Sequence, residues 1–270
     1  MSSNVRFKNI DDINRIVIKI GTSTLTYPGG KLNFHRIDQI ARVLSDLNNQ
    51  GRQIVFVTSA AIGVGVARLG RPELLASVPG KQAAASVGQA MLMKIYQRMF
   101  NDYNQIVSQV LLTKYVTDTE RTRVNAQNTM NTLLEMNVIP IVNENDTIAT
   151  EEIVFGDNDT LSATVAALID ADLLILLSDI DGLYTGNPKT NPDARLISRV
   201  DDITEDIENL ASGKGSALGT GGMITKIKAA SIAYENGIDT IIANGDNPEI
   251  LYDILEGRNV GTHFVAPSHR

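Results

Sequence analysis

A lysine stands near the end of an apolar run at the start of the chain. Lys19 lies between Ile18 and Ile20 in the run Arg15–Gly21, which leads into the hydroxyl-bearing residues up to Thr24. In open α/β sheets, ligands gather at the carboxyl ends of strands, where glycine-rich turns present backbone N–H groups. A buried ammonium group is costly without an anion, so this lysine indicates an anion site. A lysine on a solvent-exposed edge strand explains the same pattern equally well.

A second lysine follows a glycine-rich segment late in the chain. The segment Gly219–Lys226 reads Gly-Thr-Gly-Gly-Met-Ile-Thr-Lys and stands immediately before a helical pattern. Backbone N–H groups, the positive end of the helix and the ammonium group of Lys226 would converge on one phosphate-sized anion. A plain junction between a loop and a helix is the competing interpretation of the same residues.

Carboxylates and amides are dense in the middle of the chain. Asn143–Asp146 (Asn-Glu-Asn-Asp) follows a predicted strand, and Gly156–Asp159 (Gly-Asp-Asn-Asp) precedes a predicted helix. Turns explain Asn and Asp as well as an organised polar site does. The two motifs together, one after a strand and one at the start of a helix, favour the site.

Several common kinds of site are excluded by the sequence. The P-loop pattern Gly-x4-Gly-Lys-Ser/Thr is absent, and Gly63–Gly70 has the wrong glycine spacing for a dinucleotide-binding fingerprint. The three histidines, His35, His263 and His269, are too scattered to suggest a metal site, and there is no cysteine to act as a thiolate ligand or nucleophile.

Short β-branched runs alternate with longer helical patterns and would position these residues. The runs are nearly continuous in apolar character, which is typical of strands covered on both faces and favours a parallel sheet. Six strands are predicted: Arg15–Gly21, Gln53–Ser59, Ile106–Leu112, Val138–Val142, Leu173–Leu177 and Thr240–Ala243.

Helical spacing and capping residues predict four helices between the strands. Loops are predicted where Gly, Pro, Asn and charged residues are dense, and no repeat or heptad series is present. The alternation predicts an α/β protein with a mostly parallel sheet sandwiched between helices. The helices are a stripe from Ile37 to Leu47 that stops before Gly51, Ala83–Phe100, a stripe from Leu161 to Ile169 capped by Asp157, and Ile224–Asn236; the loops are Tyr27–Lys31, Arg71–Lys81 and Thr185–Asp193.

Composition limits the class of protein. The chain has 270 residues, 43% of them hydrophobic, and 24 Lys+Arg against 31 Asp+Glu give a net charge of −7. A chain of this size can build a core, and its acidic balance argues against a general nucleic-acid-binding surface. Charged residues interrupt the start of the chain, and no uncharged run reaches the ~18–20 residues of a membrane span, so a cytoplasmic protein is expected.

Six motifs carry a resemblance to the glutamate 5-kinases of the amino acid kinase family, from Ile16 to about Thr262. In this order and spacing they are highly specific. They are Lys19-Ile-Gly-Thr-Ser23, Val57-Thr-Ser-Ala-Ala61, Val142-Asn-Glu-Asn-Asp146, Phe155-Gly-Asp-Asn-Asp159, Leu177-Ser-Asp179 with Asp181-Gly-Leu-Tyr-Thr185, and Gly219–Lys226.

The resemblance implies a three-layer α/β/α fold and the ATP-dependent phosphorylation of the L-glutamate side-chain carboxylate, with Mg²⁺, as the first step of proline biosynthesis. It implies that Lys19 touches the transferring phosphoryl group, that Lys226 binds the nucleotide phosphates and that Asp159 holds both ammonium groups. Glutamate would be bound by Ser59, Asn143, Asp146 and Asn158. The nucleotide would be bound by Lys19, Ser178, Asp179, Thr220, Gly221, Gly222, Met223, Ile224, Thr225 and Lys226. No metal-coordinating side chain is implied.

The resemblance also implies a single kinase domain over residues 1–270. Its N-terminal half would bind mainly glutamate and its C-terminal half mainly ATP, without the C-terminal PUA domain of many relatives. Proline can act as a feedback inhibitor in such enzymes, and a homo-oligomer, either a dimer or a tetramer, is expected. The Ala83–Phe100 helix could face a partner copy or the core.

Two residues of one motif depart from the family pattern, and rival functions stay open. The family usually has Ser-Ser-Gly-Ala where this chain has Thr58–Ala61, and Ala60 in place of Gly is expected to limit positive φ and close backbone approach. Acetylglutamate and aspartate kinases are rival members of the family, although they usually carry a Gly-Gly pair where this chain has Gly21-Thr22. A noncatalytic amino-acid or nucleotide sensor on the same fold is the rival from another class.

Overall fold

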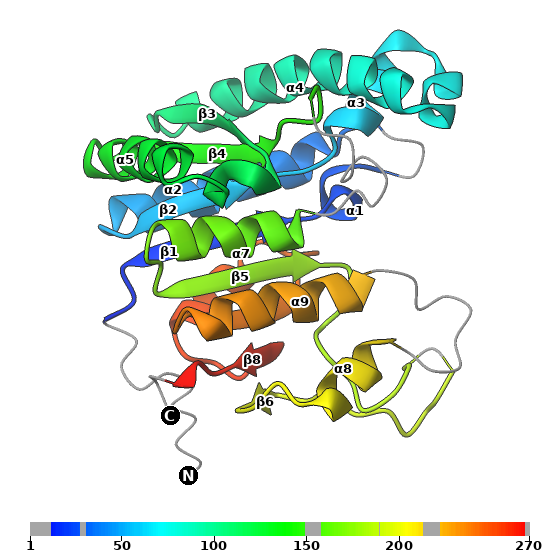
Figure 1. Ribbon diagram of the computed structural model, residues 1–270, viewed down its shortest axis with the longest axis vertical. Helices are drawn as coiled ribbons and strands as arrows, with labels where there is room; N and C mark the ends of the chain where they lie inside the picture. Colours follow the sequence, from blue (N-terminus) through cyan, green and yellow to red (C-terminus); the bar gives the residue numbers. More distant parts are fainter. Residues whose placement is uncertain (1–11, 28–30, 149–157, 189, 213–221, 268–270) are drawn as a thin grey trace.

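A single eight-stranded sheet forms the centre of the molecule (Figure 1). The computed structural model describes residues 12–27, 31–148, 158–188, 190–212 and 222–267. Along the sheet the strand order is β3-β4-β2-β1-β5-β7-β8-β6. All neighbouring strands are parallel except β7 and β8, which pair in antiparallel fashion. The mostly parallel sheet predicted from the sequence is therefore confirmed.

The six predicted strands all form, and each boundary falls within two residues of its prediction. Two short strands near the sheet edge, β6 and β8, were not predicted because two or three residues give too little pattern to recognise. The strands are β1 Arg15–Ile20, β2 Gln53–Val57, β3 Val107–Leu112, β4 Ile139–Glu144, β5 Leu173–Ser178, β6 Arg199–Val200, β7 Asp239–Asn244 and β8 Thr262–Phe264.

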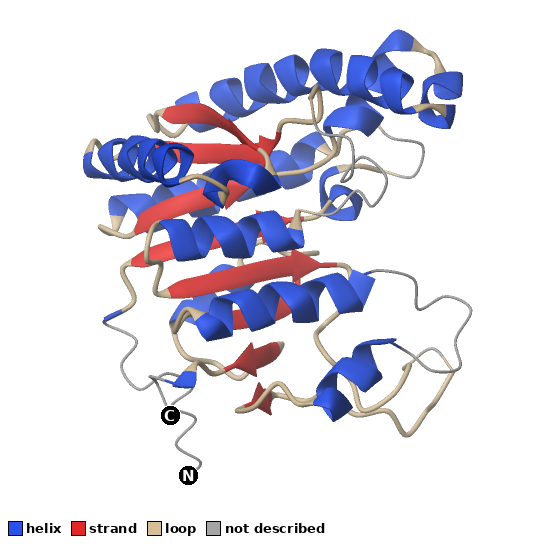
Figure 2. Ribbon diagram, viewed as in Figure 1, coloured by secondary structure: helices blue, strands red, loops and turns tan. Residues whose placement is uncertain are grey.

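Helices cover both faces of the sheet (Figure 2). The α-helices are α1 Thr22–Leu25, α2 Phe34–Asn49, α3 Ala61–Leu69, α4 Val78–Asn101, α5 Glu120–Glu135, α7 Asp159–Leu168, α8 Glu205–Ser212, α9 Gly222–Glu235 and α10 Ile250–Leu255. Two short 3-10 helices are η2 Pro72–Ala76 and η3 Lys114–Thr117. The four predicted helices correspond to α2, α4, α7 and α9.

Two predictions about loops and caps need correction. The segment Arg71–Lys81 was expected to be a loop, but it contains η2 and the first turn of α4. Ser77 caps α4 by accepting a hydrogen bond from the Gly80 backbone N–H, and Pro79 is compatible with a first helical turn. The expected cap of α7, Asp157, lies outside the described residues, and Asn158 occupies the N-cap position.

The core consists of two apolar clusters, one on each face of the sheet. On one face, side chains of α2, α4 and α10 pack against alternate residues of the central strands, such as Ile18 and Phe56. On the other face, α5, α7 and α9 pack against the intervening residues, such as Val17 and Val55. This alternation explains why the strands are apolar throughout their length. The Ala83–Phe100 segment was expected to face either a partner copy or the core. One face of α4 packs in the core, where it buries Leu92, Tyr96 and Phe100 among others.

Helices α3 and α4 pack backbone to backbone at two glycines. A Cβ atom added at Gly65 would lie 1.8 Å from the carbonyl oxygen of Ala84, and one added at Gly88 would lie 1.8 Å from that of Ala61. No side chain fits at these positions without moving the helices apart. The contact holds the start of α3, directly after β2, in a fixed place against α4.

Within the described parts of the chain, no helix is both long enough and apolar enough to cross a membrane.

Candidate active site

Polar residues meet where the parallel strands β1, β2, β4 and β5 end. Lys19 in β1 pairs with Val57 of β2 on one side and with Leu176 of β5 on the other, so the ends of these three strands are level. Val57 in turn pairs with Val142 of β4. The residues that follow these positions therefore share one edge of the sheet, where ligands bind in open α/β folds.

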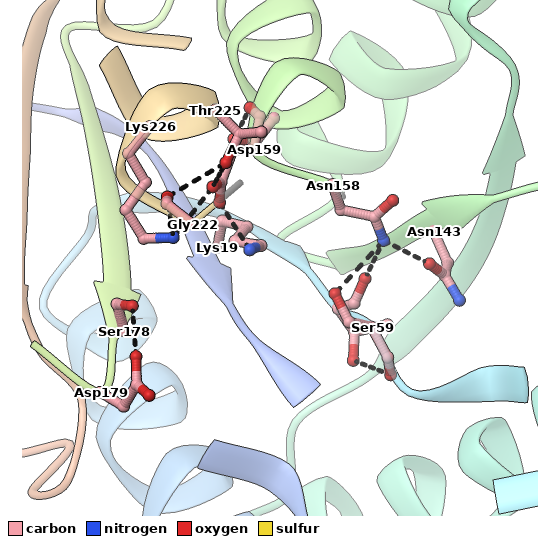
Figure 3. A network of polar contacts seen from close by, with 12 residues as sticks. Lys19, Ser59, Asn143, Asn158, Asp159, Ser178, Asp179, Gly222, Thr225 and Lys226 are labelled. Carbon is pink, nitrogen blue, oxygen red and sulfur yellow. Dashed lines mark hydrogen bonds and ion pairs between the residues drawn. The ribbon is translucent and has the colours of Figure 1, made fainter. Parts of the chain in front are cut away.

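An ion cluster of two lysines and one aspartate lies at this edge (Figure 3). Lys19 Nζ is 2.5 Å from Oδ1 of Asp159, and Lys226 Nζ is 3.0 Å from Oδ2 of the same carboxylate. The side chain of Asp159 is fully buried, and the two lysine side chains are only 6% and 8% exposed. Residues from β1 and from the first turns of α7 and α9, far apart in the sequence, thus form one charged group.

The carboxyl group of Asp159 is ionised at neutral pH. Burial by itself would raise the pKa of Asp159, but the ammonium groups of Lys19 and Lys226 outweigh it and lower this pKa to about 2. Thr225 supports the carboxylate by donating a hydrogen bond from Oγ1 to Oδ2 at 3.0 Å, and Lys226 also donates to the carbonyl oxygen of Gly222 at 3.1 Å. These three side chains carry two positive charges and one negative charge, a combination that suits an anionic ligand.

An amide cluster lies beside the ion cluster, on the side of β2 and β4. The Nδ2 atom of Asn158 donates to Oδ1 of Asn143 at 2.7 Å and to the Thr58 carbonyl oxygen at 2.6 Å, and it lies 3.4 Å from Oγ of Ser59. Asn158 occupies the N-cap of α7, but its side chain makes no capping hydrogen bond. The side chain is turned toward the site instead (Figure 3).

Asp146, the fourth residue expected to bind the amino acid, lies in the turn that begins two residues after the end of β4. Its side chain is half-buried. The structure therefore places Ser59, Asn143 and Asn158 in one hydrogen-bonded group and Asp146 at the same edge of the sheet.

The described residues that are expected to bind the nucleotide, apart from Lys19, lie at the carboxyl end of β5 and at the start of α9. Ser178 is buried and donates a hydrogen bond to Oδ1 of Asp179 at 3.1 Å, whereas Asp179 is exposed. At the start of α9, Gly222 is exposed, and Met223, Ile224 and Thr225 are half-buried. Thr220 and Gly221 lie outside the described residues.

Ala60 adopts a left-handed backbone conformation, contrary to the expectation that an alanine would limit it. Its φ is 81° and its ψ is 3°, at the N-cap of α3. The turn after β2 thus keeps the geometry for which glycine is best suited, although the Cβ atom makes it strained. Thr58, at the same turn, shares a 2.6 Å hydrogen bond with the hydroxyl group of the buried Tyr96.

Two polar residues at this edge, Gln89 and Asn244, are not predicted by the sequence motifs. Gln89 of α4 accepts a hydrogen bond from Nδ2 of Asn143 at 2.8 Å. Asn244, at the end of β7, donates to Oδ1 of Asp181 at 2.9 Å, and this bond together with that of Tyr184 lowers the pKa of Asp181. A lone glutamine inside an apolar helix stripe is the signal that could have identified Gln89.

Known proteins resemble the chain over nearly its whole length. The sequence profile of the amino acid kinase family matches residues 14–244. A glutamate 5-kinase of Clostridium acetobutylicum is 53% identical over 262 residues, covering 97% of this chain and 98% of that protein. A glutamate 5-kinase of Listeria innocua is 52% identical over 263 residues, covering 96% and 95%.

Two solved structures share the fold at low sequence identity. The UMP kinase of Bacillus anthracis superposes with a TM-score of 0.64 at 17% identity, covering 94% of this chain and 96% of that one. The UMP kinase of Ureaplasma parvum gives a TM-score of 0.66 at 16% identity, covering 94% and 99%. These two likenesses establish the architecture, a three-layer α/β/α arrangement.

Proposed function

The chain belongs to the amino acid kinase family, and from this premise we propose that it transfers the γ-phosphoryl group of ATP to the side-chain carboxylate of L-glutamate. The products are γ-glutamyl 5-phosphate and ADP, and the reaction is the first step of proline biosynthesis. The relatives that share about half of its residues over nearly the full length are glutamate 5-kinases.

The observation that carries the proposal is the pair of buried lysines held by one carboxylate beside an amide cluster. Phosphoryl transfer requires little covalent help from a protein, only alignment of the reactants and neutralisation of charge on the phosphoryl oxygens. Lys19 and Lys226 supply two positive charges less than 10% exposed, where water screens them weakly. Their shared partner Asp159 fixes the spacing between them before substrates arrive.

The roles proposed for the two lysines are those that the family resemblance implies, and the positions of the lysines support them. Lys19, at the end of the central strand β1, contacts the phosphoryl group in transfer, and Lys226, in the first turns of α9, contacts the nucleotide phosphates. An oxygen of the glutamate side-chain carboxylate forms a bond to the γ-phosphorus, and the bond from that phosphorus to the β,γ-bridging oxygen breaks, so that ADP leaves with the electron pair. The carboxylate, with an ordinary pKa of about 4.3, is ionised at neutral pH and needs no general base.

Mg²⁺ is proposed as the ion that would accompany ATP. Within the described residues there is no group of three or more acidic or histidine side chains that could hold a metal ion. Mg²⁺ usually binds through one or two carboxylates, phosphate oxygens and water and seldom in an all-protein cage. The ion would neutralise phosphate charge in addition to Lys19 and Lys226.

The amide cluster is the place proposed for the amino-acid end of glutamate. The cluster offers uncharged hydrogen-bonding groups, those of Asn143, Asn158 and Ser59, to the α-ammonium and α-carboxylate groups of the amino acid. Asp146 can accept a hydrogen bond from the α-ammonium group. The part of the chain up to the turn after β4 thus supplies three of the four residues proposed for glutamate, and Asn158 at the start of α7 supplies the fourth. The part of the chain from β5 onward supplies most of the groups proposed to bind ATP. These groups are Ser178, Asp179 and the start of α9.

Two finer properties follow from family membership and are proposed with it. Proline acts as a feedback inhibitor, and the chain assembles as a homo-oligomer, a dimer or a tetramer. Inhibition of the forward reaction by proline and light scattering of the purified protein test these two statements separately.

A hydroxamate assay tests the function. Glutamate, MgATP and hydroxylamine are expected to yield γ-glutamyl hydroxamate, because hydroxylamine traps the acyl phosphate. Lys19→Met keeps a side chain of similar length without the charge, and we expect it to lower the rate by about 10²–10³. Turnover with aspartate or acetylglutamate but not with glutamate would refute the substrate assignment. Binding of glutamate or ATP without turnover of any acid would identify a sensor instead.

A further inference from the structure

A polar side chain interrupts the buried face of α4. Gln89 is only 8% exposed, and its neighbours on the same face include Ala85 and Leu92, which are buried and apolar. A buried amide is costly unless its donors and acceptors are used. The position of Gln89, next to the end of β4, therefore calls for a partner, and that partner is Asn143.

Two backbone groups fix which way the neighbouring amides are turned. The backbone N–H of Glu144 donates to Oδ1 of Asn143 at 2.9 Å, and the Thr58 carbonyl oxygen accepts from Nδ2 of Asn158 at 2.6 Å. A backbone N–H only donates and a backbone carbonyl only accepts, so neither end of this arrangement can be reversed. Asn143 must therefore turn its oxygen toward Asn158 and its nitrogen toward α4.

Gln89 belongs to a series of four side-chain amides whose hydrogen bonds all run in the same direction, from donor to acceptor. Nδ2 of Asn143 donates to Oε1 of Gln89 at 2.8 Å, and Nε2 of Gln89 donates to Oε1 of Gln109 in β3 at 3.3 Å. Each amide accepts from one neighbour and donates to the next, from Asn158 through to Gln109. Turning over any inner member places like groups face to face at two contacts, so the orientations stabilise one another.

We propose that Gln89 is a positioning residue for the amino-acid substrate, acting through Asn143 on Asn158. The proposal rests on the function assigned above. The Nδ2 atom of Asn158 points toward Ser59 and Asn143, and its Oδ1 atom points away from both residues (Figure 3). That carbonyl oxygen is an acceptor suited to the α-ammonium group of the amino acid. Gln89 supports this orientation by accepting the hydrogen bond from Nδ2 of Asn143, which holds Oδ1 of Asn143 in place against Nδ2 of Asn158.

The backbone of α4 around Gln89 is packed tightly enough for this role. The preceding residue, Gly88, is where the backbone of α4 meets the carbonyl oxygen of Ala61 so closely that no Cβ atom fits. Ala61 begins α3, two residues after Ser59. The glutamine and the turn that carries Ser59 are thus held against each other by backbone packing, and sites held by such supporting contacts are precise.

The test replaces the glutamine by a side chain of similar length that cannot hydrogen bond. In Gln89→Met, the buried Nδ2 of Asn143 loses its acceptor, and we expect the glutamate KM to rise about 10-fold while the ATP KM changes less than about twofold. The matched control is Gln97→Met, the same change at an exposed position of α4, which should leave both constants unchanged. Equal rises in both KM values, or none in glutamate KM, would overturn the proposal.

A double-mutant cycle separates action through Asn143 from a general loosening of the fold. If Gln89 acts through Asn143, then Gln89→Met should change the glutamate KM little in an Asn143→Ala background. Full additivity of the two changes would contradict the relay.

A second measurement does not depend on catalysis. Side-chain NH₂ signals of Asn143 and Asn158 in ¹⁵N NMR spectra, assigned by their loss in aspartate variants, should shift in Gln89→Met and not in Gln97→Met. Unchanged signals would refute the positioning role. Absence of hydroxamate from the wild-type protein would refute the proposed function, whereas an active wild type with an unchanged glutamate KM in Gln89→Met would refute only the role of Gln89.

Discussion

Replacing Asp159 by asparagine should lower the stability of the protein by an amount that depends on pH. The carboxylate is fully buried between two ammonium groups, and Asp159→Asn keeps its shape while removing its charge. Removing one partner of a buried ion pair leaves uncompensated buried charge and costs about 3–5 kcal/mol. Total stabilities of about 5–15 kcal/mol are typical, so the variant should fold but be clearly weaker.

The pH dependence can be worked out from the pKa of Asp159. The ammonium groups lower this pKa from 3.8 to about 2. A difference of about 1.8 units corresponds to about 2.4 kcal/mol at about 1.36 kcal/mol per unit. Because the folded-state value is depressed, this stabilisation is fully present above about pH 5 and is lost as the pH falls through the folded-state pKa. At pH 3 about 1 kcal/mol of it should already be lost.

Urea unfolding of both proteins between pH 7 and pH 3 measures the effect. Other carboxylates titrate in both proteins, so the difference in unfolding free energy between wild type and Asp159→Asn isolates this group. The difference should shrink by about 1 kcal/mol from pH 7 to pH 3. Thr225→Val, which removes a hydrogen bond to the same carboxylate but no charge, is the control and should keep the acid-dependent loss. A difference that stays constant with pH, or a variant as stable as wild type, would refute the reasoning.

Three substitutions at the turn after β2 and in the helix pair α3 and α4 test the backbone geometry by urea unfolding. Ala60→Gly relieves the strain at φ 81°, and after the entropy cost of glycine we expect a gain of up to about 1 kcal/mol; a loss of more than about 1 kcal/mol would contradict a left-handed Ala60. Gly88→Ala places a Cβ atom 1.8 Å from the Ala61 carbonyl oxygen and should cost about 1–3 kcal/mol. Gly63→Ala in α3 is its matched control, because a Cβ atom there meets nothing within 4 Å. This substitution should stabilise the helix by up to about 1 kcal/mol. Equal effects of the two alanine substitutions would refute the close packing of α3 and α4.

Much of the fold could be predicted because a strand buried on both faces has a plain sequence pattern. Runs such as Arg15–Gly21 and Leu173–Leu177 gave strands close to β1 and β5. Short elements escaped prediction: β8, of three residues, pairs in antiparallel fashion with β7 through long-range contacts that no local pattern shows. Helix α3 was also missed, because its glycines are unfavourable for a helix in isolation. One of them, Gly65, lies where the Ala84 carbonyl oxygen of α4 leaves no room for a Cβ atom.

The sequence by itself determined the kinds of groups available at the site: two lysines after glycine-rich or apolar segments, and two clusters of amides and carboxylates. It also determined that the strands would be parallel, which brings their carboxyl ends to one edge. Either lysine could still have been an ordinary surface charge. The pattern of residues around a lysine describes its local structure, and it contains no information about which distant carboxylate will neutralise the ammonium group.

The tertiary structure decided those pairings. It brought Lys19 and Lys226, 207 residues apart, onto the two oxygens of Asp159, and it placed Gln89 of α4 against Asn143 of β4. It also forced Ala60 into a conformation that alanine disfavours. The physical reason is the same in each case. Hydrogen bonds and ion pairs depend on distances of about 3 Å between atoms, and only the packing of helices on the sheet fixes such distances between residues remote in the sequence.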